Sequence, residues 1–271
     1  MNERGFGTRA LGPVRGALRR GAVAARSRNR LVSSALRRVS QIGGGAGIDV
    51  ALGNARVRLY PNENVTDKRA YLGRPILGEG VRDLVRRLAR EADGTFRFVD
   101  VGGNSGLYSI RFAQVAREES VSFAGLAIEA FPPTFERMWF NLEASGLLGN
   151  VRTVATAVSD RNGTVTLDTE FRDLGRVRVA ADGVEVPSRL LADLVAEAGM
   201  ERIDLLKIDV EGHELAALAP FFEATAPAVW PRVVLAELLD DADPLEPLLR
   251  GHGYSITTRS KANAVFERNA V

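Results

Sequence analysis

Phe98-Val-Asp-Val-Gly-Gly-Asn-Ser-Gly-Leu107 is the stretch that decides the fold, because an apolar strand runs here into a glycine-rich turn and then a helix. Such a turn lets the backbone approach a ligand closely and directs the N-terminal amides of the helix toward it. The dinucleotide fingerprint G-x-G-x-x-G is absent, since Asn104 and Leu107 stand where its second and third glycines would be. Asparagine tolerates a positive φ better than most residues, so the turn remains possible.

The segments around this stretch alternate between strand and helix patterns. Strands are expected over residues 96–101, 122–128, 151–157, 203–208 and 232–238, after a hairpin at 48–52 and 56–60. Helices are expected over residues 81–92, 107–117, 133–145, 188–198 and 214–222, followed by an antiparallel strand pair at 254–258 and 263–267. Alternating units of this kind predict an α/β fold, with a mostly parallel sheet covered by helices on both faces.

A carboxylate follows the second strand of the alternating pattern. Residues 127–129 read Ala-Ile-Glu, and Glu129 stands 23 residues after Gly106. An acid at this strand tip can hold both hydroxyls of a ribose. Glycine-rich turns and acids at strand ends are each common, but their combination at this spacing favours binding of a nucleoside-containing cofactor. The alternative is a purely structural turn.

Residues 203–214 read Ile-Asp-Leu-Leu-Lys-Ile-Asp-Val-Glu-Gly-His-Glu and form the most unusual stretch of the chain. Because side chains alternate along an extended backbone, Lys207, Asp209 and Glu211 share one face, and His213 follows a turn. Ionisable groups at the carboxyl end of a central parallel strand are costly unless paired or used, and open α/β sheets bind ligands there. The alternative is a structural pair between Lys207 and a carboxylate, with the acids capping the next helix.

Four segments together resemble the FkbM-type methyltransferase family. They are residues 100–106, Glu129, residues 139–142 and residues 204–214, which occur in order and with suitable gaps between about residues 81 and 268. The resemblance implies a Rossmann-like class I methyltransferase fold that binds S-adenosylmethionine. It also implies a family that mostly methylates hydroxyl oxygens of natural products and glycans. Gly103 departs from the family pattern, which usually has alanine here, and this change is expected to be harmless.

The resemblance also assigns a cofactor site. The aspartate and the glycine loop after the first strand of the pattern would hold the methionine moiety, and the acid after the second strand the ribose. The residues after the third strand are candidates for the adenine, although residues 160–163 also read as a good hairpin turn. The residues expected at the cofactor are Asp100, Gly102, Gly103, Asn104, Gly106, Glu129, Ser159 and Asp160.

Catalysis is assigned to the segment after the fourth strand. Methyl transfer is an in-line displacement in which alignment supplies much of the acceleration, but an aliphatic hydroxyl also needs a base or a metal ion. Asp209 is the first choice for a position beside the transferred methyl. Glu211 and His213 could supply the base, or the two acids could bind a divalent cation. Lys207 completes the candidate set, and Glu237 either faces the same cleft or pairs with a basic residue.

The chain is expected to divide into a basic arm, residues 1–47, and a methyltransferase domain, residues 48–271. Within the domain, residues 48–80 and 160–187 would cover the cleft and select the acceptor. The first of these segments contains polar side chains suited to a sugar, although a solvated loop would read the same way. These side chains are Tyr60, Asn62, Asn64, Asp67, Arg69 and Tyr71.

The composition of the 271 residues excludes several classes of protein. The absence of cysteine excludes a disulfide scaffold, thiolate zinc sites, iron–sulfur clusters and a cysteine nucleophile. No apolar run approaches the roughly 18 residues that a membrane span needs. The net charge of +2 combines residues 1–45, with ten arginines and the single acid Glu3, at +9, and a remainder at −7. The negative domain argues against nucleic acid as a partner.

The arginine-rich arm contains an amphipathic segment, residues 31–42, whose apolar residues fall on one helical arc. Such a segment could lie on an anionic membrane, or it could be a disordered arm or a helix packed on the domain. The glycines of residues 43–47 suggest a hinge after it. We expect a cytoplasmic protein, with peripheral contact to the inner face of a membrane left open.

The sequence leaves two alternatives to an active methyltransferase. A nicotinamide-dependent oxidoreductase is disfavoured by Asn104 and by the missing third glycine. A methyltransferase-like protein that has lost catalysis and serves as a membrane-docked scaffold would account for the arm. The intact Glu129 and the acids of residues 209–213 argue against that second alternative.

Overall fold

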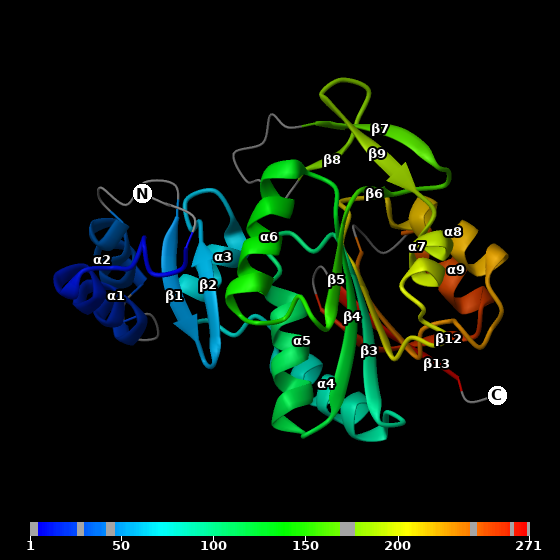
Figure 1. Cartoon of the computed structure of the whole chain (residues 1–271), viewed down its shortest axis with the longest axis horizontal. Helices are drawn as coiled ribbons and strands as arrows, with labels where there is room; N and C mark the ends of the chain where they lie inside the picture. Colours follow the sequence, from blue (N-terminus) through cyan, green and yellow to red (C-terminus); the bar gives the residue numbers. More distant parts are fainter. Residues whose placement is uncertain are drawn as a thin grey trace.

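The computed structural model describes residues 5–25, 30–41, 47–168, 177–238, 243–260 and 263–269. Its centre is a seven-stranded sheet with the strand order β12-β13-β11-β10-β3-β4-β5 (Figure 1). The strands are β3 (Thr95–Val101), β4 (Ser122–Glu129), β5 (Val151–Ala155), β10 (Leu205–Ile208), β11 (Val233–Glu237), β12 (Tyr254–Arg259) and β13 (Asn263–Arg268). Strands β11, β10, β3, β4 and β5 run parallel, and β13 pairs antiparallel with β11 and β12. The predicted mostly parallel sheet and its antiparallel C-terminal pair are confirmed.

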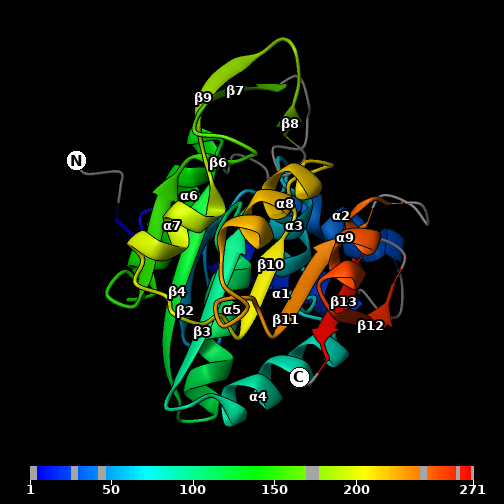
Figure 2. The same ribbon diagram turned by 90° about the vertical axis from the view of Figure 1, so that its right-hand side faces the viewer.

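Helices cover both faces of this sheet (Figure 1, Figure 2). One face is packed by α4 (Glu79–Glu91), α5 (Leu107–Glu118) and α6 (Pro132–Ala144), and the other by α7 (Leu191–Glu197), α8 (Glu214–Ala224) and α9 (Leu245–Gly251). Phe96 and Phe98 of β3 belong to the first core, whereas Val99 and Val101 belong to the second. This division follows from the alternation of side chains along a strand. The Rossmann-like α/β fold is therefore confirmed.

The order of the strands creates a switch point in the middle of the sheet. From β3 the chain moves outward through β4 and β5, and it later returns to place β10 and β11 on the other side of β3. The loops that leave the carboxyl ends of β3 and β10 therefore diverge, and open α/β sheets bind ligands in such a crevice. The register also places Lys207 of β10 beside Asp100 of β3.

A second, smaller sheet rises above the carboxyl end of the main sheet (Figure 2). Its strands are β6 (Ala157–Val158), β9 (Val184–Arg189), β7 (Gly163–Asp168) and β8 (Arg178–Val179), in that spatial order. Because β9 lies between β6 and β7, the prediction that residues 160–163 form a tight hairpin turn is wrong. The helix expected over residues 188–198 begins only at Leu191, since the residues before it pair with β7. Part of the predicted cleft cover, residues 169–176, lies outside the described residues.

A two-stranded hairpin precedes the main sheet in the chain. The predicted strands are observed as β1 (Ile48–Leu52) and β2 (Ala55–Leu59), and a short helix, α3 (Val65–Tyr71), follows them. Asn141 of α6 fixes this hairpin, because its Oδ1 accepts a hydrogen bond from the Arg58 amide at 2.6 Å and its Nδ2 donates to the Arg58 carbonyl at 3.2 Å. The hairpin is therefore part of the same packed body as α6.

The N-terminal arm contains a helical hairpin, α1 (Pro13–Ala25) and α2 (Arg30–Gln41), at the left end of Figure 1. Helix α2 matches the predicted amphipathic segment, while residues 42–46, including most of the expected hinge, lie outside the described residues. Before α1, Asp49 of β1 accepts hydrogen bonds from the amides of Gly7 (2.7 Å) and Arg9 (3.0 Å). The arm is thus attached to the domain at its start. In the part of the chain that the structure describes, no helix has the length and apolar character needed to cross a membrane.

Candidate active site

The turn after β3 is packed too tightly for side chains at its glycines. Gly102 has φ +73°, and a Cβ there would lie 2.0 Å from the carbonyl oxygen of Asp209. A Cβ on Gly103 would lie 2.5 Å from Sδ of Met138, so glycine at this position makes room for the methionine. Asn104 follows with φ 52°, in the left-handed region that asparagine tolerates. The turn is thereby fixed between α6 and the chain after β10.

Glu129 at the end of β4 is held in place by three donors from its own chain. Its Oε2 accepts a hydrogen bond from the Asn104 amide (2.7 Å), and its Oε1 accepts from the Phe131 amide (2.9 Å) and the Thr134 hydroxyl (2.8 Å). Burial raises the pKa of Glu129 above its usual value, and these hydrogen bonds oppose the shift. A carboxylate oxygen has two lone pairs, so Oε2 can accept a further bond from a ligand.

Asp100 and Lys207 form a buried pair beneath the glycine loop. Oδ2 of Asp100 accepts hydrogen bonds from the amide and the hydroxyl of Ser109, at 3.2 and 2.7 Å. Oδ1 lies 3.3 Å from Nζ of Lys207, which donates to the Gly102 carbonyl oxygen at 2.5 Å and lies 3.7 Å from Oδ2 of Asp209. Burial by itself would lower the pKa of Lys207, but the carboxylates of Asp100 and Asp209 outweigh burial and raise it.

This burial changes the interpretation of both residues. The cleft is lined by residues that include Gly102, Asn104 and Asp209, but within the described chain neither Asp100 nor Lys207 is among them. In this conformation Asp100 does not reach a ligand directly, and Lys207 is not exposed to an acceptor. The physical reason is that their opposite charges satisfy each other inside the protein. Together they join the glycine loop to the chain after β10, because Lys207 contacts the Gly102 carbonyl oxygen, Asp100 and the Asp209 carboxylate.

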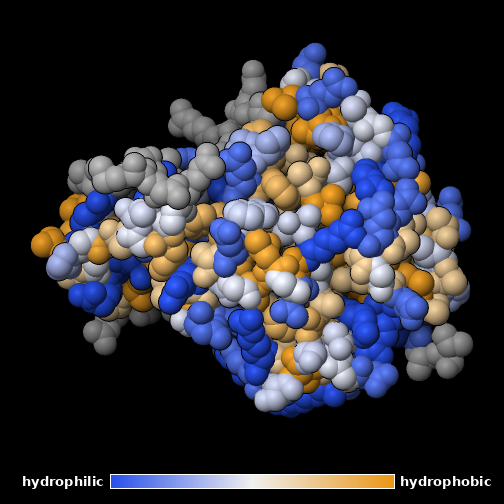
Figure 3. Space-filling model, viewed as in Figure 1, coloured by the Kyte–Doolittle hydropathy of each residue, from blue (hydrophilic) through white to orange (hydrophobic). Residues whose placement is uncertain are grey.

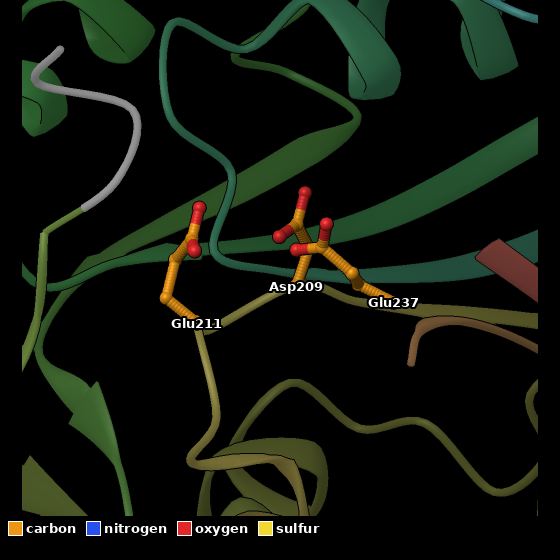
Figure 4. A group of neighbouring side chains, drawn as sticks. All are labelled: Asp209, Glu211 and Glu237. Atoms are coloured by element: carbon orange, nitrogen blue, oxygen red, sulfur yellow. The ribbon is translucent and has the colours of Figure 1, made fainter. Parts of the chain in front are cut away.

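Three carboxylates, here called the acid cluster (Asp209, Glu211 and Glu237), converge beyond the ends of β10 and β11 (Figure 4). One oxygen of each lies within 4.8 Å of an oxygen of the other two. Asp209 and Glu237 share a hydrogen bond, which requires a proton between them. Burial, and then the charge of Asp209, raises the pKa of Glu237 to about 8. The pair therefore keeps a shared proton to higher pH than a separate glutamate would.

The turn that carries Glu211 is held by Glu214, a residue that the sequence did not single out. Glu211 has φ 54° and Gly212 has φ 96°, so two consecutive residues are left-handed. Glu214, the first residue of α8, accepts hydrogen bonds from the amides of Val210 (2.9 Å) and Gly212 (3.0 Å). These bonds offset the strain of the turn. The spacing of the acids gave no indication that the side chain of Glu214 points back into this turn.

His213 links the turn after β10 to the chain after β6. Its Nε2 lies 2.9 Å from Oγ of Ser159, and that hydroxyl donates to Oδ1 of Asp160 at 3.2 Å. Because a hydroxyl has one proton, Nε2 of His213 donates here, which leaves Nδ1 as the acceptor of the neutral ring. Burial lowers the pKa of His213, so the ring is neutral at pH 7. The structure thus brings these three predicted residues together, with His213 in the cleft and Ser159 buried behind it.

Most of these groups border one cleft above the carboxyl ends of the parallel strands. The empty volume of this cleft, about 650 Å³, includes space open to solvent. The charged residues among its lining are Glu129, Asp209, Glu211 and Arg178, and His213 lies beside the acids. The apolar part comes mostly from the second sheet and the chain before it, with Phe131, Ala157, Val158, Leu167, Val177 and Val179. Of the two predicted additions, the one at residues 160–187 therefore faces the cleft.

Helix α3 and its N-cap residue Asn64 brace the glycine loop from outside the cleft. Nδ2 of Asn64 donates to Oδ1 of Asn104 (2.6 Å), and Oδ1 of Asp67 accepts from the Ser105 hydroxyl (2.5 Å). Asn64, Asp67 and Tyr71 are all buried. The expectation that these three polar side chains face a sugar acceptor is therefore wrong, because they are used as internal partners of the fold.

Comparison with known proteins places the chain among methyltransferases. The AMB antimetabolite synthetase AmbE of Pseudomonas aeruginosa is 28% identical over 207 residues, which cover 60% of this chain and 10% of the relative. The 31-O-demethyl-FK506 methyltransferase FkbM of Streptomyces tacrolimicus is 36% identical over 100 residues, covering 35% of this chain and 37% of the relative. The hexuronic acid methyltransferase AglP of Haloferax volcanii is 27% identical over 141 residues, covering 51% and 55%. The chain thus spans less than two thirds of the length of each of these relatives.

Residues 100–256 match the family model described as the methyltransferase FkbM domain. This match covers more than half of the chain and includes the glycine loop, Glu129, the acid cluster and His213. The arm and the hairpin β1–β2 lie outside it. The chain therefore belongs to the FkbM methyltransferase family.

Proposed function

We propose that this chain is an S-adenosylmethionine-dependent O-methyltransferase whose acceptor is a hydroxyl group of a sugar, a glycan or a natural product. The observation that carries the proposal is that one cleft is lined both by the hydrogen-bonded carboxylate at the tip of β4 and by Asp209 and Glu211 of the acid cluster. Family membership supports methyl transfer over the oxidoreductase and scaffold alternatives. The names of two relatives, a 31-O-demethyl-FK506 methyltransferase and a hexuronic acid methyltransferase, support a hydroxyl-bearing acceptor.

The residues around the cleft fit this cofactor. Gly102 carries no side chain and lines the cleft, so a ligand there can approach the backbone of the loop closely. Glu129 retains acceptor capacity for a ribose hydroxyl, and Phe131 with the apolar wall suits an adenine ring. When bound, the cofactor supplies an activated methyl group on a cationic sulfonium. The carboxylates of the cleft favour such a positive charge.

Asp209 is our choice for the group that removes the proton of the acceptor hydroxyl. Asp209 lines the cleft, so its carboxylate can reach an acceptor hydroxyl bound there. Lys207 lies 3.7 Å from Asp209 and is itself fixed by the carbonyl of the glycine loop. This buried cation therefore orients the proposed base relative to the loop.

Two other groups compete with Asp209 for this role. Nδ1 of His213 is an acceptor in the neutral ring, and the acid cluster offers the oxygen ligands that divalent cations prefer. His213→Gln keeps a side-chain amide near Ser159 but removes the basic nitrogen. Turnover that survives both His213→Gln and treatment with EDTA assigns proton removal to the carboxylates, and its loss in either arm reassigns the role.

Calorimetry and isotope transfer test the proposal itself. The full chain is titrated with S-adenosylhomocysteine and, separately, with NAD; binding of NAD alone overturns the cofactor assignment. The enzyme is then incubated with trideuteromethyl-labelled S-adenosylmethionine and extracts of sugars, glycans and small metabolites. Mass spectrometry should find a product that gains one trideuteromethyl group on oxygen. Transfer to nitrogen or carbon would contradict the hydroxyl acceptor while leaving the cofactor assignment intact.

A further inference from the structure

The helical hairpin α1–α2 displays apolar side chains to solvent and keeps a polar one inside. In α2, Leu31 is 82% exposed and Val39 is 46% exposed. Ser33 of the same helix is buried, and its hydroxyl donates to the Ala22 carbonyl oxygen of α1 at 2.8 Å. A helix on the surface of a globular protein normally has the opposite orientation, with its apolar stripe facing the core.

The exposed apolar residues of α2 lie on one side of the helix. Leu31, Ala35 and Val39 are spaced at intervals of four residues, so they stand one above another, and all three are exposed. Arg38, which is also exposed, lies next to Val39 on that side. Figure 3 shows hydrophobic and strongly hydrophilic atoms side by side at this end of the molecule. This side of α2 is therefore amphipathic.

The charge of the hairpin identifies the chemistry of what covers this side. The described residues of the arm, 5–25 and 30–41, contain arginines and no acidic residue. A second copy of the chain would bring one cationic hairpin against another, which like-charge repulsion opposes. A surface that offers both anionic groups and an apolar interior satisfies the arginines and the aliphatic side chains together. An anionic lipid bilayer has both properties.

We propose that the α1–α2 hairpin docks on an anionic lipid bilayer. Leu31, Ala35 and Val39 enter the boundary between headgroups and acyl chains, and the exposed arginines Arg20 and Arg38 contact the phosphates. The inference goes beyond the proposed methyl transfer, because it assigns a location to the enzyme and does not depend on the identity of the acceptor.

The hairpin is attached to the domain firmly enough to orient it on a surface. Nε of Arg19 in α1 donates to the Tyr71 carbonyl oxygen of α3 at 2.9 Å. Arg58 of β2 donates to the Gly5 carbonyl oxygen (3.0 Å) and pairs with Asp49 at 2.6 Å, inside the protein. Docking of the hairpin would therefore hold the braced glycine loop, and with it the cleft, in a defined orientation to the bilayer.

Vesicle co-sedimentation of the full-length chain tests this proposal. Vesicles of phosphatidylcholine alone are compared with vesicles that contain about a third phosphatidylglycerol, at about 0.1 M salt. The variant Leu31→Ser/Val39→Ser removes the apolar side chains without adding charge, and Arg20→Gln/Arg38→Gln removes two exposed cations. Val65→Ser on α3 is the matched control, because Val65 is 55% exposed outside the hairpin.

The full chain and Val65→Ser should pellet with the anionic vesicles and not with the neutral ones. Each double variant should lower partitioning onto the anionic vesicles by about tenfold or more. The burial of one leucine side chain, or the contact of two arginines with phosphates, contributes a binding free energy that corresponds to roughly that factor. Partitioning that is equal on both vesicles, or unchanged in Leu31→Ser/Val39→Ser, overturns the proposal. A dimer in sedimentation velocity that this variant dissociates also overturns it, in favour of a second copy. Thermal melts, expected to be unchanged at these exposed positions, exclude unfolding as the cause.

Discussion

The carboxylate at the tip of β4 has surroundings opposite to those of the carboxylates at the tips of β10 and β11. Glu129 accepts three hydrogen bonds from its own chain, two of them from backbone amides that the turns fix in place. Asp209 and Glu237 instead face each other and must share a proton. The charge at the first tip is compensated by donors of the chain itself. The second is left electrostatically crowded, which is typical of groups that exchange protons.

The comparison separates the effects expected from mutating the two tips. Loss of the compensated carboxylate removes the acceptor of the chain's own donors and also the acceptor offered to a ligand. Both ligand affinity and the stability of the fold should therefore fall. Loss of a crowded carboxylate relieves repulsion, so stability should hold or rise while chemistry suffers. The four predictions below test this contrast, beginning with the largest expected effect.

Asp209→Asn should lower kcat by about a thousandfold, within the range attributed to general acid–base groups, and leave affinity for S-adenosylhomocysteine nearly unchanged. The amide keeps the size of the side chain but cannot take a proton from the acceptor. Steady-state kinetics and calorimetry measure the two quantities. Asp83→Asn, the same change at an exposed position of α4, is the control. Full activity in Asp209→Asn would end the assignment of the base.

Glu129→Ala should weaken binding of S-adenosylhomocysteine by about 10- to 100-fold, because a hydrogen bond to a charged group contributes roughly 1.5–3 kcal/mol. The free energy of unfolding should also fall, since the amides of Asn104 and Phe131 lose their acceptor. Calorimetry and denaturant unfolding provide the readouts, with Glu136→Ala on the exposed side of α6 as the matched change. A variant with intact affinity would show that the tip of β4 is purely structural.

Glu237→Gln should change how stability depends on pH. The pKa of Glu237 rises from 4.5 to about 8 on folding, so between these values the folded chain keeps a proton that the unfolded chain has lost. The stability that this group contributes is complete below 4.5 and is lost as pH rises toward 8. A glutamine cannot ionise. As the pH rises from 4.5 toward 8, the Tm of Glu237→Gln should therefore increase by a few degrees relative to the Tm of the wild type. If the Tm values of the wild type and of Glu237→Gln changed with pH in the same way, the shared proton would be contradicted. Glu223→Gln on α8 serves as the control.

Asn64→Ala should have the smallest effect, because it removes a support of the glycine loop and leaves the loop itself. Asn64 caps α3 by accepting from the Asp67 amide at 3.0 Å, and it donates to Asn104. The free energy of unfolding should fall by about 1 kcal/mol, as for other N-cap residues, with a few-fold loss of cofactor affinity. Asn62→Ala, at an exposed neighbouring position, should change neither. Equal losses of stability and of cofactor affinity in Asn64→Ala and Asn62→Ala would show that Asn64 does not support the glycine loop.

The sequence located both strand tips but not the state of the groups there. Glu129 and Asp209 were placed correctly at the ends of two parallel strands, β4 and β10, because a strand followed by a turn has a recognisable local pattern. The family resemblance placed Asp100 at a cofactor, although it is buried against Lys207. Spacing along the chain gives the strand end that a residue occupies, but not the depth at which its side chain lies. Glu214 was overlooked for the same reason, since its bonds run backward into the turn.

The small elements around the sheet show a similar division. The hairpin β1–β2 was predicted from Gly53 and the flanking alternation, but the contact of the following helix α3 with the glycine loop was not. The hydrogen bond from Ser105 to Asp67 joins residues 38 positions apart, and no local pattern encodes such a partner. The second sheet was also missed as a sheet, because β9 separates β6 from β7.

By itself, the sequence determined the alternating α/β architecture, the glycine turn and the family, since these depend on periodicity and turn chemistry over short stretches. It also determined the cationic arm, which is a matter of composition alone. Only the tertiary structure decided which charges are compensated and which are crowded, and which face of α2 is turned to solvent. Burial and choice of partner depend on residues brought together from distant parts of the chain, and they set the pKa values and exposed surfaces on which both proposals rest.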